Sequence, residues 1–405
     1  MRRLLTTKTV LPFATLFFLC IFFFQTSKAQ FVINSDSAFK AGTPNSGRIW
    51  GYAFGDYYYK AHADTLNRGG SNQYTGIPKN RSAFQFRRIY LGYDYNISHK
   101  FVAELLLAAE DNVIQGNNPP SGDLLSDNKF TFYIKLANIR WKNIWKGTDL
   151  VVGQMSTPAF PLLSEKIWGY RSVERTIADI RRTPSFDLGA SLQGVFDSKG
   201  NYGYNVMVGN GTGAKPEGDN FKWFYADVFA RFLDKRLVFD LYADYERLSW
   251  LNGFHHSRNM VKGYVAYTTP GFTVGVEGFI NQGKNDVVGV NGVLKDTLDA
   301  HAAGISAYVH GNISKEKLAY FARFDSYNPN TKYDNVKYTK YTGFTSNYEP
   351  NNKEQFITAG LDFTPVKNVH FMPNVWYTKY RANEAVSNTS YDLVYRMTFY
   401  FVFGK

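Results

Sequence analysis

The 405-residue sequence is poor in cysteine and lacks long apolar runs after its first thirty positions. Its single cysteine, Cys20, excludes an intrachain disulfide and a metal site built from several thiolates. Beyond residue 30 no stretch approaches the roughly 18 consecutive apolar residues of a transmembrane helix, which excludes a helical membrane protein. Acidic residues are outnumbered, at 34 against 46 Lys and Arg, but the basic residues form no concentrated stripe outside one loop. This distribution argues against nucleic-acid binding.

The first 29 residues have the pattern of a secretory signal peptide. Three cations near the start precede an apolar run from Val10 to Phe24, and Ser27 and Ala29 place small residues at the two positions that a signal peptidase reads. We predict cleavage before Gln30, because the run is short for a membrane anchor. Removal of residues 1–29 takes away four cations and no acid, so the net charge falls from +12 to +8 and no cysteine is left.

Aromatic residues, in contrast, are abundant at 17%, although the mean hydropathy is −0.32. In the C-terminal stretch 391–405, apolar side chains occupy one parity and polar side chains occupy the other. The first set is Tyr395, Met397, Phe399, Phe401 and Phe403, and the second includes Asp392, Arg396 and Thr398. A period of two predicts an extended strand with one apolar face and one wet face.

The same alternation recurs in about sixteen segments of about ten residues each, the length that a tilted strand needs to cross a bilayer. The predicted strands are 48–60, 84–97, 100–110, 129–141, 148–155, 186–197, 202–209, 221–232, 236–246, 259–268, 271–280, 301–311, 317–327, 354–364, 369–379 and 391–403. Short links such as 97–99, 233–235, 269–270 and 365–368 alternate with long polar stretches such as 61–83, 111–128, 156–185, 281–300 and 328–353. Such links are typical of bacterial outer-membrane barrels, which have short periplasmic turns and long outer loops.

A soluble β-sandwich would also show alternation, with its apolar faces inside and its charges outside. We favour a barrel because the short and long links alternate strictly and no break divides the chain into domains of sandwich size. The predicted fold is an all-β, transmembrane antiparallel up-and-down β-barrel of about 16 strands over residues 30–405, located in the cell outer membrane. Its terminal aromatic strand resembles the sorting signal that such barrels present to the outer-membrane insertion machinery.

Charged residues on the strands would then face a water-filled lumen, where both signs are tolerated. In 236–246, for example, Asp240 has the opposite parity to Leu237 and Phe239. The lumen-lining candidates on this criterion are Arg88, Glu104, Asp227, Arg231, Asp240, Arg323, Asp325 and Arg396. Because they carry both signs, we expect solute selectivity to depend on a loop more than on the wall.

The loop 156–187 differs from the other connections because it is apolar and has a helix-like middle, 172–182. Val173, Ile177 and Ile180 share one side at helical spacing, and in a barrel such a stripe would pack on the inner wall and narrow the pore. The anion-selectivity candidates of this loop are Lys166, Arg171, Arg175, Arg181 and Arg182. Rings of Arg or Lys at a constriction favour anions, and guanidinium groups suit phosphate oxygens. The alternative is that these side chains pair with nearby carboxylates such as Glu174 and Asp179, and only hold the loop in place.

The loop and the strands near it carry a set of short motifs. They are Gly153-Gln154-Met155, Thr157-Pro158, Glu174-Arg175, Asp187-Leu188-Gly189 and, in the second predicted strand, Arg87-Arg88-Ile89-Tyr90-Leu91-Gly92. Together they resemble the phosphate-selective porin O and P family, most strongly across about 150–195. The resemblance implies a sixteen-stranded, often trimeric channel for small anions, with basic residues on inward-folded loops. The sequence departs from the family at 159–161 and at Phe186, close to where selectivity would be set.

The sequence therefore predicts an outer-membrane porin that lets small hydrophilic solutes diffuse passively, with anions such as phosphate favoured and with no cofactor or metal. A barrel that does not conduct and binds a partner through its outer loops is the alternative. An enzyme is not expected. The best hydrolase candidate, the pair His255 and His256 beside Ser257, lacks the sequence motif that surrounds a catalytic nucleophile.

Overall fold

The computed structural model describes residues 44–404, apart from 69–72, 111–131, 182–183, 252, 292–293, 316, 345–351 and 383–389. The predicted signal peptide lies outside the described residues. Among the described helices, none is long and apolar enough to cross a membrane.

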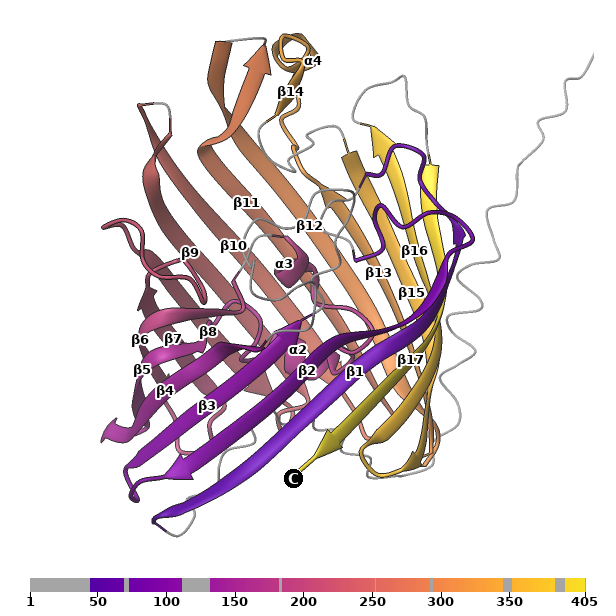
Figure 1. Cartoon of the computed structure of the whole chain (residues 1–405). Helices are drawn as coiled ribbons and strands as arrows, with labels where there is room; N and C mark the ends of the chain where they lie inside the picture. Colours follow the sequence, from indigo (N-terminus) through magenta and orange to yellow (C-terminus); the bar gives the residue numbers. More distant parts are fainter. Residues whose placement is uncertain are drawn as a thin grey trace, which may run out of the picture.

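In this part of the chain, sixteen long strands close into one antiparallel barrel (Figure 1). The first eight are β1 (Ser46–His62), β2 (Ser82–Asn96), β3 (Phe101–Glu110), β4 (Phe132–Trp145), β5 (Thr148–Ser156), β6 (Phe186–Val195), β7 (Tyr202–Gly209) and β8 (Trp223–Phe232). The others are β9 (Leu237–Leu251), β10 (Phe254–Thr268), β11 (Phe272–Asn291), β12 (Leu294–Ser314), β13 (Leu318–Asn328), β15 (Asn352–Val366), β16 (Val369–Ala382) and β17 (Ser390–Phe403). Strand β1 pairs with both β2 and β17, so the sheet has no open edge. The predicted fold class is confirmed.

One predicted connection is wrong. The stretch 281–300, expected to be a long polar loop, continues β11 and β12 as a hairpin beyond the barrel. Val287, Leu298 and Ala300 of this hairpin bury their side chains against Tyr338 of the short helix α4 (Asn335–Tyr338). A two-residue strand, β14 (Gly343–Phe344), also pairs with β11 there. This small apolar cluster stabilises strand structure where the composition alone indicated a loop.

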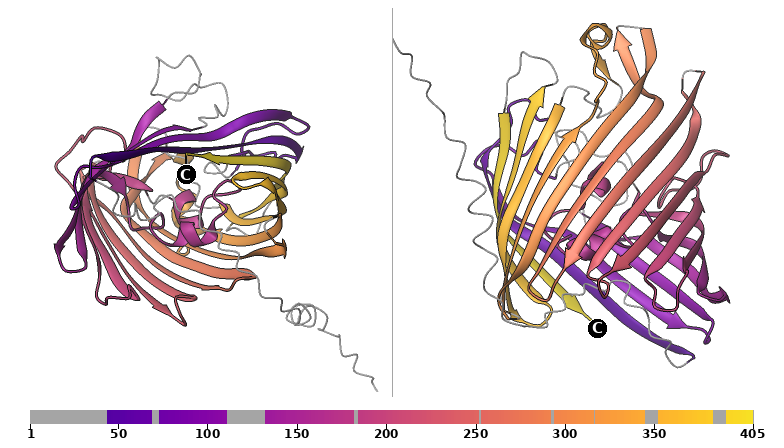
Figure 2. Two further views of the ribbon diagram at one scale, coloured as in Figure 1. Left: turned by 90° about the horizontal axis from the view of Figure 1, so that it is seen from below. Right: turned by 180° about the vertical axis from the view of Figure 1, so that it is seen from behind.

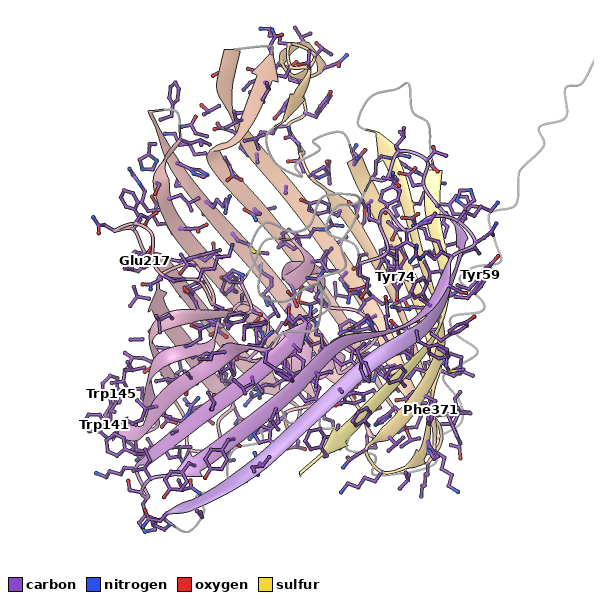
Figure 3. The ribbon with its side chains drawn as sticks, viewed as in Figure 1. Tyr59, Tyr74, Trp141, Trp145, Glu217 and Phe371 are labelled. Carbon is purple, nitrogen blue, oxygen red and sulfur yellow. The ribbon has the colours of Figure 1, made fainter. Side chains whose placement is uncertain are left out.

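Burial in the barrel is the reverse of burial in a soluble protein. On β9, the apolar side chains of Phe239 and Leu241 are 45% and 56% exposed, whereas the intervening Asp240 is 4% exposed. Asp240 accepts a hydrogen bond from Lys262 on β10, with 2.9 Å between Oδ2 and Nζ. Figure 3 shows Trp141, Trp145 and Phe371 at the outer edge of the barrel in the same way. Apolar side chains on the outside and paired charges on the inside are the arrangement that a lipid environment requires.

The interior nevertheless contains an apolar core. Trp50, Phe54 and Tyr90 on β1 and β2 face inward and are almost fully buried. They cannot be buried by the wall alone, because a barrel of this size leaves an open lumen unless something fills it. The view from below in Figure 2 shows the short helices of the segment between β5 and β6 within the ring of strands, where they cover this inner wall.

Candidate functional site

The segment 157–185, which joins β5 to β6, crosses the inside of the barrel, and we call it the inward loop. Tyr170 donates a hydrogen bond from Oη to Asp362 Oδ2 on β15, at 3.3 Å. His310 on β12 donates from Nε2 to the carbonyl oxygen of Ile167, at 3.0 Å. Both partners lie on strands far round the barrel from β5 and β6. The inward loop therefore spans the lumen and is held against the opposite wall.

The helix predicted over 172–182 is wrong. The loop contains α2 (Ser164–Trp168) and a single turn, α3 (Ile177–Ile180), which begins after Thr176. Between them, the carbonyl oxygens of Ser172 and Val173 accept hydrogen bonds from the Arg87 side chain on β2. A carbonyl oxygen that accepts from a side chain in this way does not accept the backbone N–H four residues later, as it would in a helix. The contacts with the wall thus replace the helix that the local sequence favours.

The apolar side of the inward loop packs on the aromatic inner wall. Trp168 of α2 is 1% exposed, and its ring lies 4.9 Å from the ring of Tyr308 between centroids. The ring of Tyr170 lies 4.7 Å from that of Phe321. Val173 is fully buried in the same cluster. Burial of such rings is worth roughly 1.5–3 kcal/mol each, so this packing is a major part of the attachment of the loop.

Glu174 is the polar centre of this attachment. Its Oε2 accepts hydrogen bonds from Trp376 Nε1 on β16 and from Gln73 Nε2 in the connection between β1 and β2, both at 2.9 Å. The connection 63–81 therefore also reaches into the lumen, where Tyr74 is fully buried. Burial alone would raise the pKa of Glu174, but the charges of Arg175 and Arg396 and the Trp376 hydrogen bond outweigh it, so its pKa lies below 4.5.

The structure places the charged groups of the inward loop mostly in ion pairs. Arg171 contacts Glu165 and lies 2.7 Å from Asp179. Arg181 pairs with Glu354 on β15, with 2.5 Å between Nη2 and Oε2. These contacts match the alternative in which the arginines hold the loop. Arg182 lies outside the described residues.

Two carboxyl groups of this network have pKa values shifted in opposite directions. Burial raises the pKa of Glu165, and the charge of Arg171 does not fully compensate for it. Burial also opposes ionisation of Asp179, but Arg171, Arg175 and Arg88 together lower its pKa below 3.8. Arg175 is the most exposed of the described loop arginines, with 3.9 Å from its Nη1 to Asp179 Oδ1.

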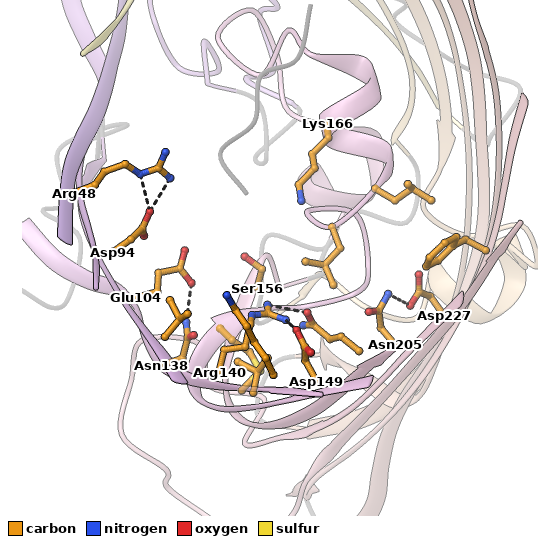
Figure 4. A pocket seen from close by; sticks show the side chains of 18 of the residues that line it. Arg48, Asp94, Glu104, Asn138, Arg140, Asp149, Ser156, Lys166, Asn205 and Asp227 are labelled. Carbon is orange, nitrogen blue, oxygen red and sulfur yellow. Dashed lines mark hydrogen bonds and ion pairs between the residues drawn. The ribbon is translucent and has the colours of Figure 1, made fainter. Parts of the chain in front are cut away.

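A cavity of about 460 Å³ lies between the inward loop and the wall formed by β1 to β8 (Figure 4). Lys166 of α2 extends into it from the loop, and Glu104, Asp227 and Arg231 line it from the wall. Asp227 accepts a hydrogen bond from Asn205 Nδ2 at 2.5 Å. Of the loop cations that the structure describes, Lys166 is the one that lines this cavity.

The other predicted wall residues face inward but lie outside this cavity. Asp240 pairs with Lys262, as described above. The remaining contacts are Arg88 with Glu110, Arg323 with Asp325 at 2.5 Å, and Arg396 Nε with Asn374 Oδ1 at 2.7 Å. Arg88, Arg323, Asp325 and Arg396 hold strands and loops together at a distance from Glu104, Asp227 and Arg231. Asp240 is different, because its carboxyl group contacts that of Asp227 on the neighbouring strand β8.

Three cations that line the cavity were not predicted from the sequence: Arg48, Arg140 and Lys142. Arg48 pairs with Asp94 at 2.7 Å, and Arg140 with Asp149 at 3.2 Å. All three have the inward parity of their strands, so the signal that identified Arg88 and Arg231 could have identified them. Arg48 is the first residue of the predicted strand 48–60, and Lys142 lies just beyond the predicted strand 129–141.

A fourth missed residue, Arg87, was hidden by a β-bulge. Phe54 on β1 pairs with Arg88, whereas the next residue, Gly55, pairs with Phe86, so Arg87 is an extra residue in β2. The bulge lets two consecutive arginines face inward, which strict alternation forbids. Arg87 Nε lies 2.6 Å from Asp56 Oδ2, and its guanidinium reaches the inward loop.

The histidine pair considered for hydrolysis lies on β10. His256 Nε2 is 2.8 Å from Asp286 Oδ1, and the same oxygen accepts a hydrogen bond from Arg258 Nε at 2.5 Å. Within the described residues, the His256 ring bonds to this carboxylate and to no serine hydroxyl. The contact is an ion-pair network between β10 and β11 rather than an activated nucleophile.

A comparison with models of protein families and with curated proteins gives no match. Solved structures do match in fold. The outer membrane channel DcaP of Acinetobacter baumannii superposes with a TM-score of 0.62 and 11% identity, over 89% of this chain and 98% of that one. An anion-selective porin from Comamonas acidovorans gives a TM-score of 0.56 and 11% identity, over 89% and 100%. OmpF of Salmonella typhi, in complex with daunomycin, gives 0.55 and 10%, over 89% and 98%. At these identities the likeness shows the fold, which this chain shares with solved outer-membrane channels over nearly its whole described length.

Proposed function

We propose that the protein is an outer-membrane channel through which small hydrophilic solutes diffuse passively, with a preference for anions such as phosphate. The observation that carries this proposal is the charged cavity between the inward loop and the wall. A hydrated space lined by both signs admits polar solutes, and the apolar outer face suits a bilayer. The fold that the chain shares with DcaP and the Comamonas porin supports the same function. Assembly as a homotrimer belongs to this proposal on the resemblance alone.

The cations of the cavity support the anion preference. The cations Arg48 and Arg140 are neutralised by Asp94 and Asp149. Lys142 and Arg231 form no ion pair with a described carboxylate, and the Arg231 guanidinium donates to the carbonyl oxygen of Gly200 at 2.9 Å. Such cations attract anions without a competing internal partner.

Single-channel conductance in planar bilayers, with a KCl gradient, tests both parts of the proposal. We expect stepwise conductance and a reversal potential of the sign that anion preference gives. Lys142→Gln and Arg231→Gln should each lower the anion-to-cation permeability ratio by up to about fourfold, because a positive charge about 10 Å away in water attracts an anion by about 0.4 kcal/mol and repels a cation equally. Lys284→Gln, at an exposed position far from the cavity, is the matched control. Preference for cations in the unmodified protein would refute the anion proposal.

A barrel that does not conduct is the second candidate, because two connections fill much of the lumen. Tyr74 from 63–81 and Phe160 and Trp168 from the inward loop are almost completely buried inside the barrel. Such packing would leave the cavity closed at one end. This candidate predicts no conductance above leak in the same experiment, and long outer loops that bind a partner.

A further inference from the structure

Basic residues recur in the short turns at the end of the barrel where β1 begins and β17 ends. In the described part of the chain seven short connections lie at this end, and six of them contain a lysine with an exposed side chain. These lysines, which we call the turn rim, are Lys100, Lys146, Lys199, Lys235, Lys315 and Lys367. The seventh connection, 269–271, has none. In barrels of this architecture the short turns face the periplasm.

Each lysine of the turn rim has an exposed large apolar residue within three positions before it. The six residues are Ile97, Trp145, Phe196, Leu233, Ile313 and Val366. Phe196 is 71% exposed and Leu233 is 63% exposed, more than most of the side chains on the outer face of the strands. Ile97, Phe196 and Leu233 lie in the turns, whereas the other three apolar residues lie at the ends of the preceding strands. Apolar side chains this exposed are costly in water, so their repeated pairing with lysine indicates a surface that is half apolar and half charged.

Among the described residues, no carboxylate neutralises the charges of the turn rim. None of the six ammonium groups forms an ion pair with a described carboxylate. Asp197, the acid near Lys199, uses its Oδ1 to accept the backbone N–H groups of Asn201 and Tyr202, at 2.7 and 3.1 Å. Arg236 adds a further exposed cation to the rim.

We propose that the turn rim binds the phosphate headgroups of anionic phospholipids in the periplasmic leaflet of the outer membrane. The apolar residue in or just before each turn lies at the level of the acyl chains, and the flexible lysine stem carries its ammonium group outward to the phosphate. A soluble anion or an anionic cell-wall polymer would be attracted by the lysines alone and would leave the apolar residues in water. The pairing of both features in six turns therefore fits a lipid surface.

The inference rests on the membrane location in the proposed function, but not on conduction. Its test is native mass spectrometry of the folded barrel with phosphatidylglycerol and phosphatidylcholine of identical acyl chains. We expect about tenfold tighter binding of phosphatidylglycerol, since each lysine near such a surface contributes measurably and several act together. Replacing all six rim lysines by glutamine should reduce this preference to about twofold or less.

The matched control removes six exposed lysines from the opposite end of the barrel. The six substitutions are Lys79→Gln, Lys215→Gln, Lys284→Gln, Lys332→Gln, Lys337→Gln and Lys340→Gln. This variant should keep the phosphatidylglycerol preference, because its remaining lysines include the whole turn rim. Equal losses in both variants would show an effect of net charge and overturn the proposal, as would an unchanged preference in the rim variant. If the sixfold rim variant does not fold, Lys199→Gln combined with Lys235→Gln should still lower the preference about twofold, and an unchanged preference would overturn the proposal.

Two further experiments distinguish lipid binding from the binding of other anions. Glycerol phosphate at the same concentration should not compete with phosphatidylglycerol, and Phe196→Ser with Leu233→Ser should weaken lipid binding. Competition by the soluble headgroup, or binding to purified cell-wall sacculi that needs the rim lysines but no lipid, would overturn the proposal. A rim variant that conducts like the unmodified protein but loses lipid preference leaves the proposed function intact. A barrel that fails to enter bilayers contradicts the proposed function itself.

Discussion

Glu174 joins three parts of the molecule: the inward loop, the wall strand β16 and the connection 63–81. Its carboxylate accepts hydrogen bonds from Trp376 and Gln73, and Arg175 and Arg396 lower its pKa despite burial. The pKa of such a carboxyl group is lower when the inward loop is attached to the wall than when the loop is released into water. The group therefore stabilises the attached loop at pH values above its ordinary pKa of 4.5. This contribution is lost as the pH falls through the lowered pKa.

We therefore predict that acid loosens the inward loop. Asp179, with its lowered pKa, acts in the same direction as Glu174, whereas Glu165, with its raised pKa, opposes them. Hydrogen exchange in 165–180, corrected for intrinsic rates, should be slow at pH 7 and faster near pH 3. Glu174→Gln should already exchange faster at pH 7 and should respond less to acid.

The matched control for this prediction is Glu217→Gln, in an outer loop where the carboxylate pairs with Lys222. It should show the same acid response as the unmodified protein. Exchange in the inward loop that is independent of pH, or a response in Glu174→Gln equal to that of the unmodified protein, would show that this carboxylate does not anchor the loop.

At the scale of single elements, the sixteen strands could be predicted because each repeats one simple rule. The outer face of each strand contacts lipid and requires apolar residues, whereas the inner face carries paired charges. The resulting period of two can be recognised in the sequence without knowing which strands contact one another. The rule fails where the backbone departs from it. The bulge at Arg87 shifts the parity within β2, and the hairpin of β11 and β12 continues because Tyr338, distant in the sequence, covers it.

The inward loop shows a different limit of prediction. Its apolar composition singled it out, but its helical pattern was misleading, because carbonyl oxygens in 172–175 are taken by Arg87 and Arg323 on two wall strands. The cavity residues Arg140 and Lys142 were missed for a related reason. Their charge is evident in the sequence, but which inward-facing cations remain near open space depends on where the loop packs.

Gly153, in one of the motifs that resemble the porin family, gives a prediction at the scale of a strand. Its φ is +120°, and a Cβ there would lie 2.3 Å from the carbonyl oxygen of Ala137 on β4. Both the positive φ and the contact with backbone disfavour any other residue. Gly153→Ala should destabilise the barrel by about 1–3 kcal/mol, measured as a lower urea midpoint of unfolding in detergent.

The matched control is Gly263→Ala on β10, where an added Cβ meets nothing within 4 Å. Its midpoint should stay close to that of the unmodified protein. If both substitutions lowered the midpoint equally, the loss would reflect strand propensity in general, and the close approach of β4 and β5 at Gly153 would not be the cause.

At the scale of the whole molecule, one side of the lumen is filled by inward-folded connections and the other side contains the cavity. The aromatic inner wall near β1 and the strands from β12 to β17 is covered by the inward loop and by 63–81. The charged side chains of β1 to β8 remain beside the cavity. The composition of the two inner walls explains this division. Rings such as Trp50 and Phe321 are stabilised when the loops bury them, whereas charged side chains are stabilised by hydration.

The inside-out arrangement is tested most directly by a scan of single cysteine substitutions along β4 in liposomes, on the chain without residues 1–29, which contains no other cysteine. The scanned positions are Asn138, Ile139, Arg140, Trp141 and Lys142. Cysteines at the three even positions should react with a small water-soluble thiol reagent, since these positions line the cavity. Cysteines at the two odd positions should be protected by lipid and should react once detergent replaces it. Uniform reactivity along the strand, or protection at the even positions with reaction at the odd ones, would contradict an inside-out barrel with a water-filled, charged cavity.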